Sequence, residues 1–243
     1  MRPNTKFIIT VPFNNRKFRP ERLTKEWIEH RMEIFMNTGY KSLMSQTNQQ
    51  YEAVVFYDIE SENEIKTALK PFEPLADNVY FMDVKTGVNY IKESLKGYDY
   101  LCYTKMDTDN MYHESYIQYL YDYMPKEESH CLAFTKGYSY NAFTGEMAKY
   151  IARREYFYTQ LYTTKEYLEG ARRKFPLGGE ESAKNIPHEL IEDREMFMIM
   201  CHDSNVNNTV NLVKSREAVV SMEERIDIWS QFTHNKELFY LKK

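Results

Sequence analysis

The first 110 residues alternate between short apolar runs and segments with helical periodicity. Each apolar run has the length of a buried strand and is followed by a polar turn. Strands that alternate with helices form parallel βαβ units, so the sequence predicts an α/β fold with a doubly wound, mostly parallel sheet flanked by helices. The expected strands are Lys6–Val11, Glu52–Tyr57, Asn78–Met82 and Tyr98–Tyr103, and the expected helices are Thr24–Thr38, one opened by a capping box at Ser61–Glu64, and Val88–Leu95.

The rest of the chain is less regular. Residues 147–163 fit either a pair of strands or a helix, because Tyr, Phe, Arg and Thr alternate ambiguously there. No linker, repeat or low-complexity tract interrupts the chain, so we expect one domain over residues 1–243. The elements expected here are the helix His113–Met124, the strand His130–Phe134, a small hairpin in Lys136–Gly145, the strand Met196–Cys201 and the helix Glu217–Phe232.

Composition excludes several classes of protein. A formal net charge of −4 argues against a protein that works mainly on a nucleic-acid backbone. The three cysteines lie in apolar runs without paired spacing, as buried thiols in a reducing compartment do. No signal peptide and no apolar stretch of about 20 residues is present, so we expect a cytoplasmic protein. Few Gly and many Tyr are typical of an AT-rich genome, such as that of a virus acting in a host cytoplasm.

Two aspartates stand one residue apart after the fourth predicted strand. Side chains of a strand repeat every second residue, so Asp107 and Asp109 are expected to point the same way at its carboxyl end. Open α/β sheets bind ligands at such strand ends. Paired carboxylates suit Mg²⁺ or Mn²⁺ with a diphosphate bound to the ion. Asp58, which ends the second predicted strand, is expected at the same edge.

The Asp107/Asp109 pair also occurs in other kinds of site. A calcium-binding EF-hand is excluded, because Met111, Tyr112 and Gln118 stand where an oxygen ligand, Gly and Glu are needed. A solvated loop with two surface acids remains open. An aspartyl phosphohydrolase with Asp107 as nucleophile and Asp109 as acid/base also remains open, although the downstream Lys and acidic pair that it needs are not evident.

Further candidate residues lie later in the chain. His202 follows a predicted buried strand and could complete a metal shell as a neutral imidazole, although a single His is more often structural. Asn205, Asn207 and Asn208 could orient the same loop. The basic stretches at 153–158 and 172–174 could receive an anionic acceptor or form a solvated face. Phosphate-loop and dinucleotide fingerprints are absent from the sequence.

Together these segments resemble the rhamnosyltransferase-like group of GT-A glycosyltransferases. The resemblance runs from about Phe7 to Asn208 and rests on the order of the blocks. The family often has a third acid where this chain has Asn110, and Arg where Lys105 stands, which leaves the donor open. The matching blocks are Trp27–Phe35, Ser42–Thr47 with the strand ending in Asp58, the Asp-x-Asp segment Thr104–Asn110, Lys136–Tyr138 and Met200–Asn208.

The resemblance implies a GT-A (Rossmann-like) fold and a metal-dependent glycosyltransferase that uses Mn²⁺ or Mg²⁺. A nucleoside-diphosphate sugar would be the donor: a UDP- or dTDP-sugar, with rhamnose as one candidate. Residues of about 1–110 would form the nucleotide-sugar half and about 111–243 the acceptor half. The acceptor would be a glycan, a lipid-linked saccharide or a hydroxylated nucleobase in DNA.

The resemblance also implies roles for individual residues. Asp58 would hold the base, Asp107 the ribose or the metal, and Asp109 the metal, with His202 as a further ligand. Thr10, Pro12 and Arg31 would line the nucleotide pocket, and Lys105 would lie beside the Asp-x-Asp pair.

An inverting transferase also needs a carboxylate that deprotonates the acceptor hydroxyl. Asp193 and Glu192 are the candidates in the segment Pro187–Asp193. An acidic helix start would explain these two residues equally well. A non-catalytic carbohydrate- or nucleic-acid-binding protein that keeps the fold is the third function considered, beside the transferase and the phosphohydrolase.

Overall fold

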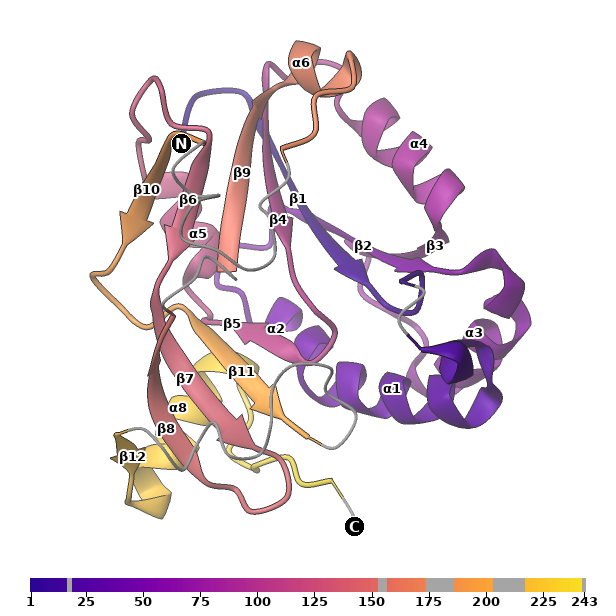
Figure 1. Cartoon of the computed structure of the whole chain (residues 1–243), viewed down its shortest axis with the longest axis vertical. Coiled ribbons are helices and arrows are strands. Elements are labelled where there is room, and N and C mark those ends of the chain that lie inside the picture. The colour runs from indigo at the N-terminus through magenta and orange to yellow at the C-terminus, as the bar shows by residue number, and fades with distance from the viewer. Residues whose placement is uncertain (17–18, 153–156, 174–185, 203–216, 242–243) are drawn as a thin grey trace.

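The computed structural model describes residues 1–16, 19–152, 157–173, 186–202 and 217–241, and these form two β-sheets with helices packed around them (Figure 1). The larger sheet has seven strands in the order β10 (His188–Ile191), β6 (Cys131–Phe134), β9 (Phe157–Thr163), β4 (Tyr100–Lys105), β1 (Thr5–Pro12), β2 (Glu52–Tyr57) and β3 (Val79–Asp83).

Most strands of the larger sheet are parallel. β1 lies at its centre and pairs in parallel with β2 and β4, and β2 pairs in parallel with β3. β9 is antiparallel to both β4 and β6, and β10 is parallel to β6. Among the described strands of this sheet, β9 alone therefore runs against the others. The predicted α/β class and mostly parallel central sheet are confirmed.

Helices cover both faces of the larger sheet. Side chains on the two faces of β1 belong to different hydrophobic clusters. Phe7, Ile9 and Val11 lie in one cluster and Ile8 lies in the other. The first cluster also takes residues from α1 (Lys25–Asn37), α2 (Gly39–Met44), α3 (Glu62–Leu69) and α5 (Tyr116–Asp122). The second takes residues from α4 (Val84–Ser94) and α6 (Thr164–Leu168). Short 3-10 turns occur at η1 (Pro20–Leu23), η2 (Ile59–Ser61) and η3 (Lys70–Phe72).

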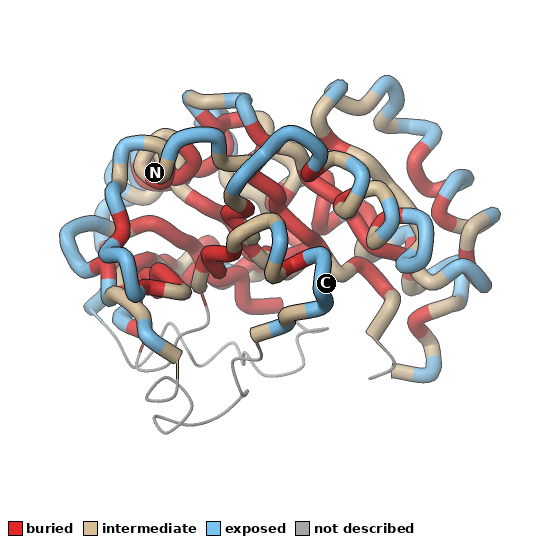
Figure 2. The backbone as a smooth tube through the Cα atoms, turned by 90° about the horizontal axis from the view of Figure 1, so that it is seen from above, coloured by how far each residue is buried: buried red, intermediate tan, exposed pale blue. Residues whose placement is uncertain are grey.

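The smaller sheet replaces the small hairpin that the sequence predicts. It has five strands in the order β12 (Ala218–Val219), β8 (Met147–Ile151), β7 (Lys136–Asn141), β11 (Phe197–Cys201) and β5 (Asn110–Tyr112), and α8 (Met222–Thr233) packs on it. The expected hairpin is the β7–β8 pair. Figure 2 shows the buried strands of the core enclosed by helices and turns with exposed outer residues.

Both faces of β11 are buried. Phe197, Ile199 and Cys201 pack into the core shared with the larger sheet. Met198 and Met200 alternate with them and pack under α8. This explains why the run Met196–Cys201 reads as a continuous apolar strand rather than an alternating one.

Several local expectations need correction. The capping box at Ser61 does not form: its hydroxyl donates to the Asp58 carbonyl (2.8 Å), and the η2 turn precedes the helix. α4 begins at Val84, because the Asp83 carboxylate accepts hydrogen bonds from the amides of Lys85 and Thr86. α8 begins at Met222 rather than at 217, with Ser221 as its N-cap.

The ambiguous segment 147–163 contains two strands that do not pair with each other. β8 joins the smaller sheet beside β7, whereas β9 inserts between β4 and β6 of the larger one. The basic residues Arg153 and Arg154, Lys174, and Asn205, Asn207 and Asn208 lie outside the described residues. The three cysteines are buried and form no disulfide, as expected. None of the helices in the described ranges has the length and hydrophobicity needed to cross a bilayer.

Candidate active site at the carboxyl edge of the sheet

The carboxyl ends of β1, β2 and β4 meet at one edge of the larger sheet (Figure 1). These ends carry Pro12, Asp58 and Lys105, and the Met106 amide extends the ladder by donating to the Thr10 carbonyl (2.9 Å). Asp58 and the Asp107–Asp109 segment thus lie at the same edge of the sheet, as predicted, with the end of β1 between them. This edge is where open α/β sheets bind ligands.

The two aspartates of the Asp-x-Asp segment have different surroundings. Regular strand geometry ends at Lys105, and the Asn110 amide donates to the Asp107 carbonyl (3.1 Å) to close a turn. The side chain of Asp107 is 47% exposed, whereas that of Asp109 is 10% exposed. The alternation of side chains along the strand therefore ends before this turn. The prediction that the two carboxylates point the same way is wrong, because one is exposed and the other is buried.

Asp109 lies in a buried cluster with Arg31 of α1 and His202, which follows β11. Its Oδ2 is 2.9 Å from His202 Nε2 and 3.5 Å from both Arg31 Nη atoms. Arg31 Nη1 is also 3.3 Å from His202 Nε2, and Nη2 donates to the Thr108 hydroxyl. Burial raises the pKa of the Asp109 carboxyl, but Arg31 and His202 outweigh it and lower that pKa to about 2.

Asp107 lies among cations on the exposed side of the same turn. Its Oδ1 is 3.5 Å from Arg16 Nη1 and 3.9 Å from Lys105 Nζ. Burial lowers the pKa of the Lys105 ammonium, Asp107 opposes that shift and Arg16 adds to it. The formal charge of this group of three is +1, so it favours an anionic ligand.

The fit of the buried cluster to a divalent ion is decided by Arg31. Two ligands of one ion lie about 3.0 Å apart when each is about 2.1 Å from it at a right angle, so the Asp109–His202 distance alone suits a metal. Arg31 Nη1 lies 3.5 Å from Asp109 Oδ2 and 3.3 Å from His202 Nε2. An ion about 2.1 Å from both of these atoms, on the side where Arg31 lies, would be only about 1.6 Å from Nη1, which is too close for two cations. On that side of the pair, Arg31 in this position takes the place that a divalent ion would need.

Within the described ranges, no group of three or more His, Cys, Asp and Glu side chains is arranged to hold a metal ion. Asp107, the other predicted ligand, pairs with Arg16 and Lys105 instead.

The remaining predicted nucleotide-binding residues are engaged in the fold. One carboxylate oxygen of Asp58 accepts from Arg22 Nη2 (2.6 Å), and the other accepts from the Glu60 amide (3.2 Å). The Thr10 hydroxyl is buried and donates to the Thr104 carbonyl (3.3 Å). Pro12 ends β1 at the edge. A nucleobase that bonds Asp58 would thus share its carboxylate with Arg22.

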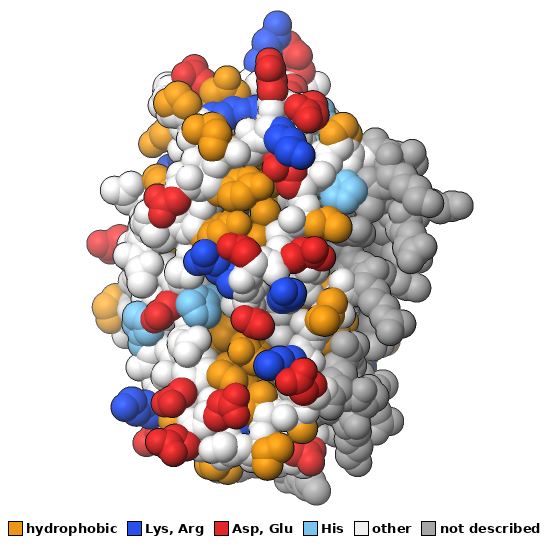
Figure 3. Space-filling model, turned by 90° about the vertical axis from the view of Figure 1, so that its left-hand side faces the viewer, with side chains coloured by type: hydrophobic (Ala, Val, Ile, Leu, Met, Phe, Trp, Pro, Cys, Tyr) orange, Lys and Arg blue, Asp and Glu red, His pale blue; other side chains and the backbone are white. Residues whose placement is uncertain are grey.

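Asp193 and Glu192 follow β10 at the same edge, but they are not in contact with the Asp-x-Asp segment. β9 and β6 separate β10 from β4, so the strand spacing places these acids roughly 14 Å away along the sheet. Asp193 accepts from the Tyr119 hydroxyl (3.5 Å) and pairs with Arg194 (3.2 Å). Glu192 accepts from the Thr135 hydroxyl (3.4 Å). Seen from the side of β10, acidic, basic and hydrophobic side chains are interspersed (Figure 3).

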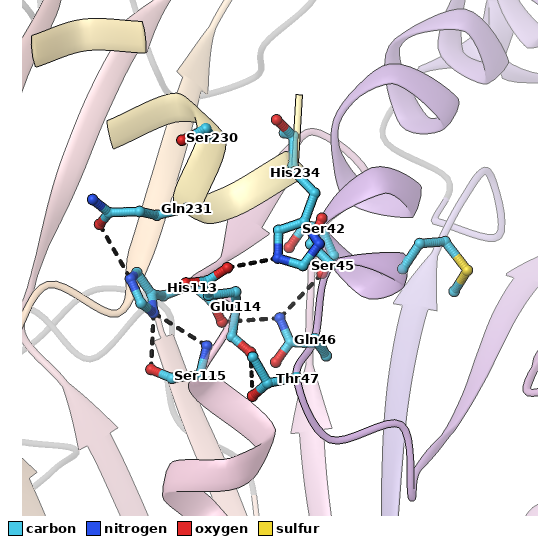
Figure 4. A network of polar contacts seen from close by, with 12 residues as sticks. Ser42, Ser45, Gln46, Thr47, His113, Glu114, Ser115, Ser230, Gln231 and His234 are labelled. Atoms are coloured by element: carbon cyan, nitrogen blue, oxygen red, sulfur yellow. Dashed lines mark hydrogen bonds and ion pairs between the residues drawn. The ribbon is translucent and has the colours of Figure 1, made fainter. Parts of the chain in front are cut away.

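The chain just after the Asp-x-Asp turn is held by a polar network (Figure 4). Gln46, at the end of α2, donates to the His113 carbonyl (2.9 Å) and accepts from the Ile117 amide (3.0 Å). His234, which follows α8, pairs with Glu114 (2.6 Å). The carboxyl end of β5 is thereby held against α2 and α8, and the turn that presents Asp109 leads directly into this strand.

Unsatisfied polar atoms gather around the edge. Buried polar groups without a partner are rare in folded proteins, and each one calls for an explanation. Nine buried side-chain N and O atoms in the described ranges lack a hydrogen-bond partner. Five of the nine belong to residues around this edge, namely Asn15, Arg22, Trp27, Arg31 and Asn110.

Sequence analysis missed some of these residues. The sequence predicts no role at the site for Arg16, for Trp27, or for Thr108, which stands between the two aspartates. Trp27 and Arg31 are one helical turn apart on α1, with the guanidinium carbon 5.8 Å from the ring centroid. That spacing is visible in the sequence, whereas no pattern places Arg16 beside Asp107.

Comparison with known proteins gives only distant likenesses. No protein-family model matches the chain, and no curated protein matches it. Among solved structures, Staphylococcus aureus TarS 1–349 in complex with UDP-GlcNAc has a TM-score of 0.47 at 15% identity, over 92% of this chain and 64% of that chain. A 4-diphosphocytidyl-2C-methyl-D-erythritol synthase from Anaerococcus prevotii has a TM-score of 0.38 at 12% identity, over 78% of this chain and 87% of that chain. Likenesses of this strength assign no activity.

Proposed function

We propose that this protein is a glycosyltransferase of the GT-A type that uses a nucleoside-diphosphate sugar. The observation that carries the proposal is the group of Arg16, Lys105 and Asp107, which has a net positive charge and lies at the carboxyl edge of the sheet beside the buried Asp109 cluster. A nucleotide sugar carries a negatively charged diphosphate, which matches this charge. The order of sequence blocks that resembles the rhamnosyltransferase-like group supports the same assignment.

The proposed reaction places charge where this edge can stabilise it. The acceptor oxygen forms a bond to the anomeric carbon, and the bond from that carbon to the diphosphate oxygen breaks with its electron pair. Negative charge grows on the departing diphosphate, and preorganised cations at the strand ends stabilise it. The proton of the acceptor hydroxyl passes to a carboxylate, for which Asp193 and Glu192 remain the proposed bases.

The finer features are proposals as well. The donor is a UDP- or dTDP-sugar, with rhamnose among the candidates, and the acceptor is a glycan, a lipid-linked saccharide or a hydroxylated nucleobase in DNA. The predicted need for Mn²⁺ or Mg²⁺ stays a prediction, to which the position of Arg31 lends no support.

The test is a panel of UDP-, dTDP- and GDP-sugars, dTDP-rhamnose included. We expect a thermal shift and slow hydrolysis with at least one donor. Asp109→Asn should lower that hydrolysis by about 100-fold or more with an unchanged circular dichroism spectrum, because the Asp109 carboxylate holds Arg31 and His202 in place at the site. Asp99→Asn is the matched control, since Asp99 lies at the opposite edge of the sheet and bonds Asn4 (3.0 Å). A panel with neither shift nor turnover refutes the proposal.

Further measurements distinguish the transferase from a phosphohydrolase and from a non-catalytic binding protein. A phosphohydrolase would be trapped by beryllofluoride at Asp107 and would hydrolyse phosphate esters. The buried position of Asp109 does not favour it, because the acid/base would have to act from within the Arg31–His202 cluster. A non-catalytic binding protein would bind sugars without turnover, and Asp109→Asn would leave that binding unchanged.

A further inference from the structure

We propose that Arg16 and Lys105 hold the diphosphate of the nucleotide, and that Arg31 occupies the place of the divalent ion beside Asp109 and His202. This inference rests on the proposed function and adds to it which groups neutralise the leaving diphosphate. It assigns a role to Arg16, which the sequence did not single out, and it changes the role of Asp107 from metal ligand to partner of the two cations.

The position of Arg31 carries the first half of the proposal. Its guanidinium contacts Asp109, His202 and Thr108 at once, and its side chain is 11% exposed. The face of the Trp27 ring lies against it as well. A planar guanidinium is suited to such a fixed, many-partner site, since it presents its donors in a rigid fork. The single negative charge of Asp109 is thereby balanced within the cluster.

The surroundings of Asp107 carry the second half. Arg16 and Lys105 both approach the same carboxylate oxygen, at 3.5 Å and 3.9 Å. Their side chains are 35% and 29% exposed, so both can turn a charged end toward a ligand in solution. Lys105 is the last residue of β4, at the edge where ligands of open α/β sheets bind.

A diphosphate would complete this group electrostatically. Two cations and one carboxylate leave a net positive charge, and a diphosphate carries at least two negative charges. Arg binds phosphate oxygens through its fork and Lys binds them as a point charge.

The experiment measures binding of UDP, dTDP and GDP by calorimetry, first in EDTA and then with Mn²⁺. We expect at least one nucleotide to bind in EDTA, with an affinity that Mn²⁺ changes by less than about threefold and that high salt weakens. Inorganic pyrophosphate should compete with it. This readout does not depend on turnover.

Four variants sharpen the test. Lys105→Met and Arg16→Gln should each weaken binding by about tenfold or more, the usual effect of losing a hydrogen bond to a charged group. Asp107→Asn should leave binding equal or tighter, because it removes a negative charge beside the phosphates. Lys96→Met is the control for loss of a cation, since Lys96 is 76% exposed before β4, at the other edge of the sheet. Melting temperatures verify that each variant is folded.

Each outcome decides between the two proposals. Binding that appears only with Mn²⁺, or that Asp107→Asn abolishes, overturns the inference and leaves the transferase standing with a metal. Full binding in Lys105→Met and Arg16→Gln together overturns it as well. A protein that binds no nucleotide in either condition refutes both the inference and the proposed function.

Discussion

Residues far apart in the sequence form the candidate site. Asp109 lies 78 positions after Arg31 and 93 before His202, yet all three are in contact. Asp107, only two positions away, faces another group of residues. The turn between Lys105 and Asn110 separates them, because it rotates the backbone out of the strand. The chemistry at this edge is thus divided into a buried, charge-balanced cluster and an exposed, cationic one.

The proposed base can be tested at this scale. Asp193→Asn should lower sugar transfer by about 100-fold or more, because an amide cannot take the proton of the acceptor hydroxyl. Donor binding should stay unchanged, since Asp193 lies roughly three strand spacings from β4. Transfer kinetics and nucleotide calorimetry give the two readouts, with Glu128→Gln, an exposed acid in the connection between α5 and β6, as control. Unaltered transfer would mean that the base lies elsewhere.

Edge strand β10 shows how an element is attached by few interactions. It pairs with β6 on one side, and Glu189 joins it to the connection between α5 and β6. The carboxylate of Glu189 accepts from Ser129 (2.6 Å), the Lys126 amide (3.0 Å) and Tyr123 (2.8 Å). Glu192 and Asp193 follow this strand directly, so its attachment also positions the proposed bases.

The attachment of β10 should depend on pH. Burial raises the pKa of Glu189, but the three donors outweigh it and lower that pKa below the usual value. The ionised side chain therefore stabilises the fold above its unfolded pKa of about 4.3, and this contribution is lost as the pH falls through the folded pKa. Glu189→Gln should cost about 1 kcal/mol at neutral pH, a small value because the side chain is partly open to solvent.

Urea unfolding from pH 7 to pH 3 measures this effect. The difference between wild type and Glu189→Gln should be constant down to about pH 5 and shrink below about pH 4. Glu127→Gln is the control, since Glu127 is exposed in the same connection. A difference that stays the same at every pH would show that the charge of Glu189 does not matter.

The two sheets share a core at the scale of the whole molecule. α1 places Phe35 in the cluster of the larger sheet and Ile34 in the cluster under α8. β11 likewise contributes to both clusters from its two faces. Elements that belong to two cores couple them, so the predicted single domain should unfold as one unit even though the chain exceeds the usual size of two-state proteins.

The two tryptophans report on the two cores separately. Trp27 packs edge-on against Phe13 in the first, and Trp229 is 1% exposed in the second. In Trp229→Phe and Trp27→Phe, the remaining tryptophan should give a fluorescence transition in urea that coincides with the circular dichroism transition of the same variant. Comparison within one variant removes the effect of the substitution on stability. Separate midpoints would show that the halves unfold independently.

The sequence by itself determined the α/β class, the succession of strands and helices along the first 110 residues, and the sheet edge at which Asp58 and the Asp-x-Asp segment lie. Local periodicity and apolar runs encode these features, because each element must bury its own apolar face. The tertiary structure alone decided that Arg31 lies against Asp109 and His202, that Arg16 lies beside Asp107, and that 147–163 divides between two sheets. Contacts between distant segments depend on how the elements pack, and no local pattern of residues specifies that packing.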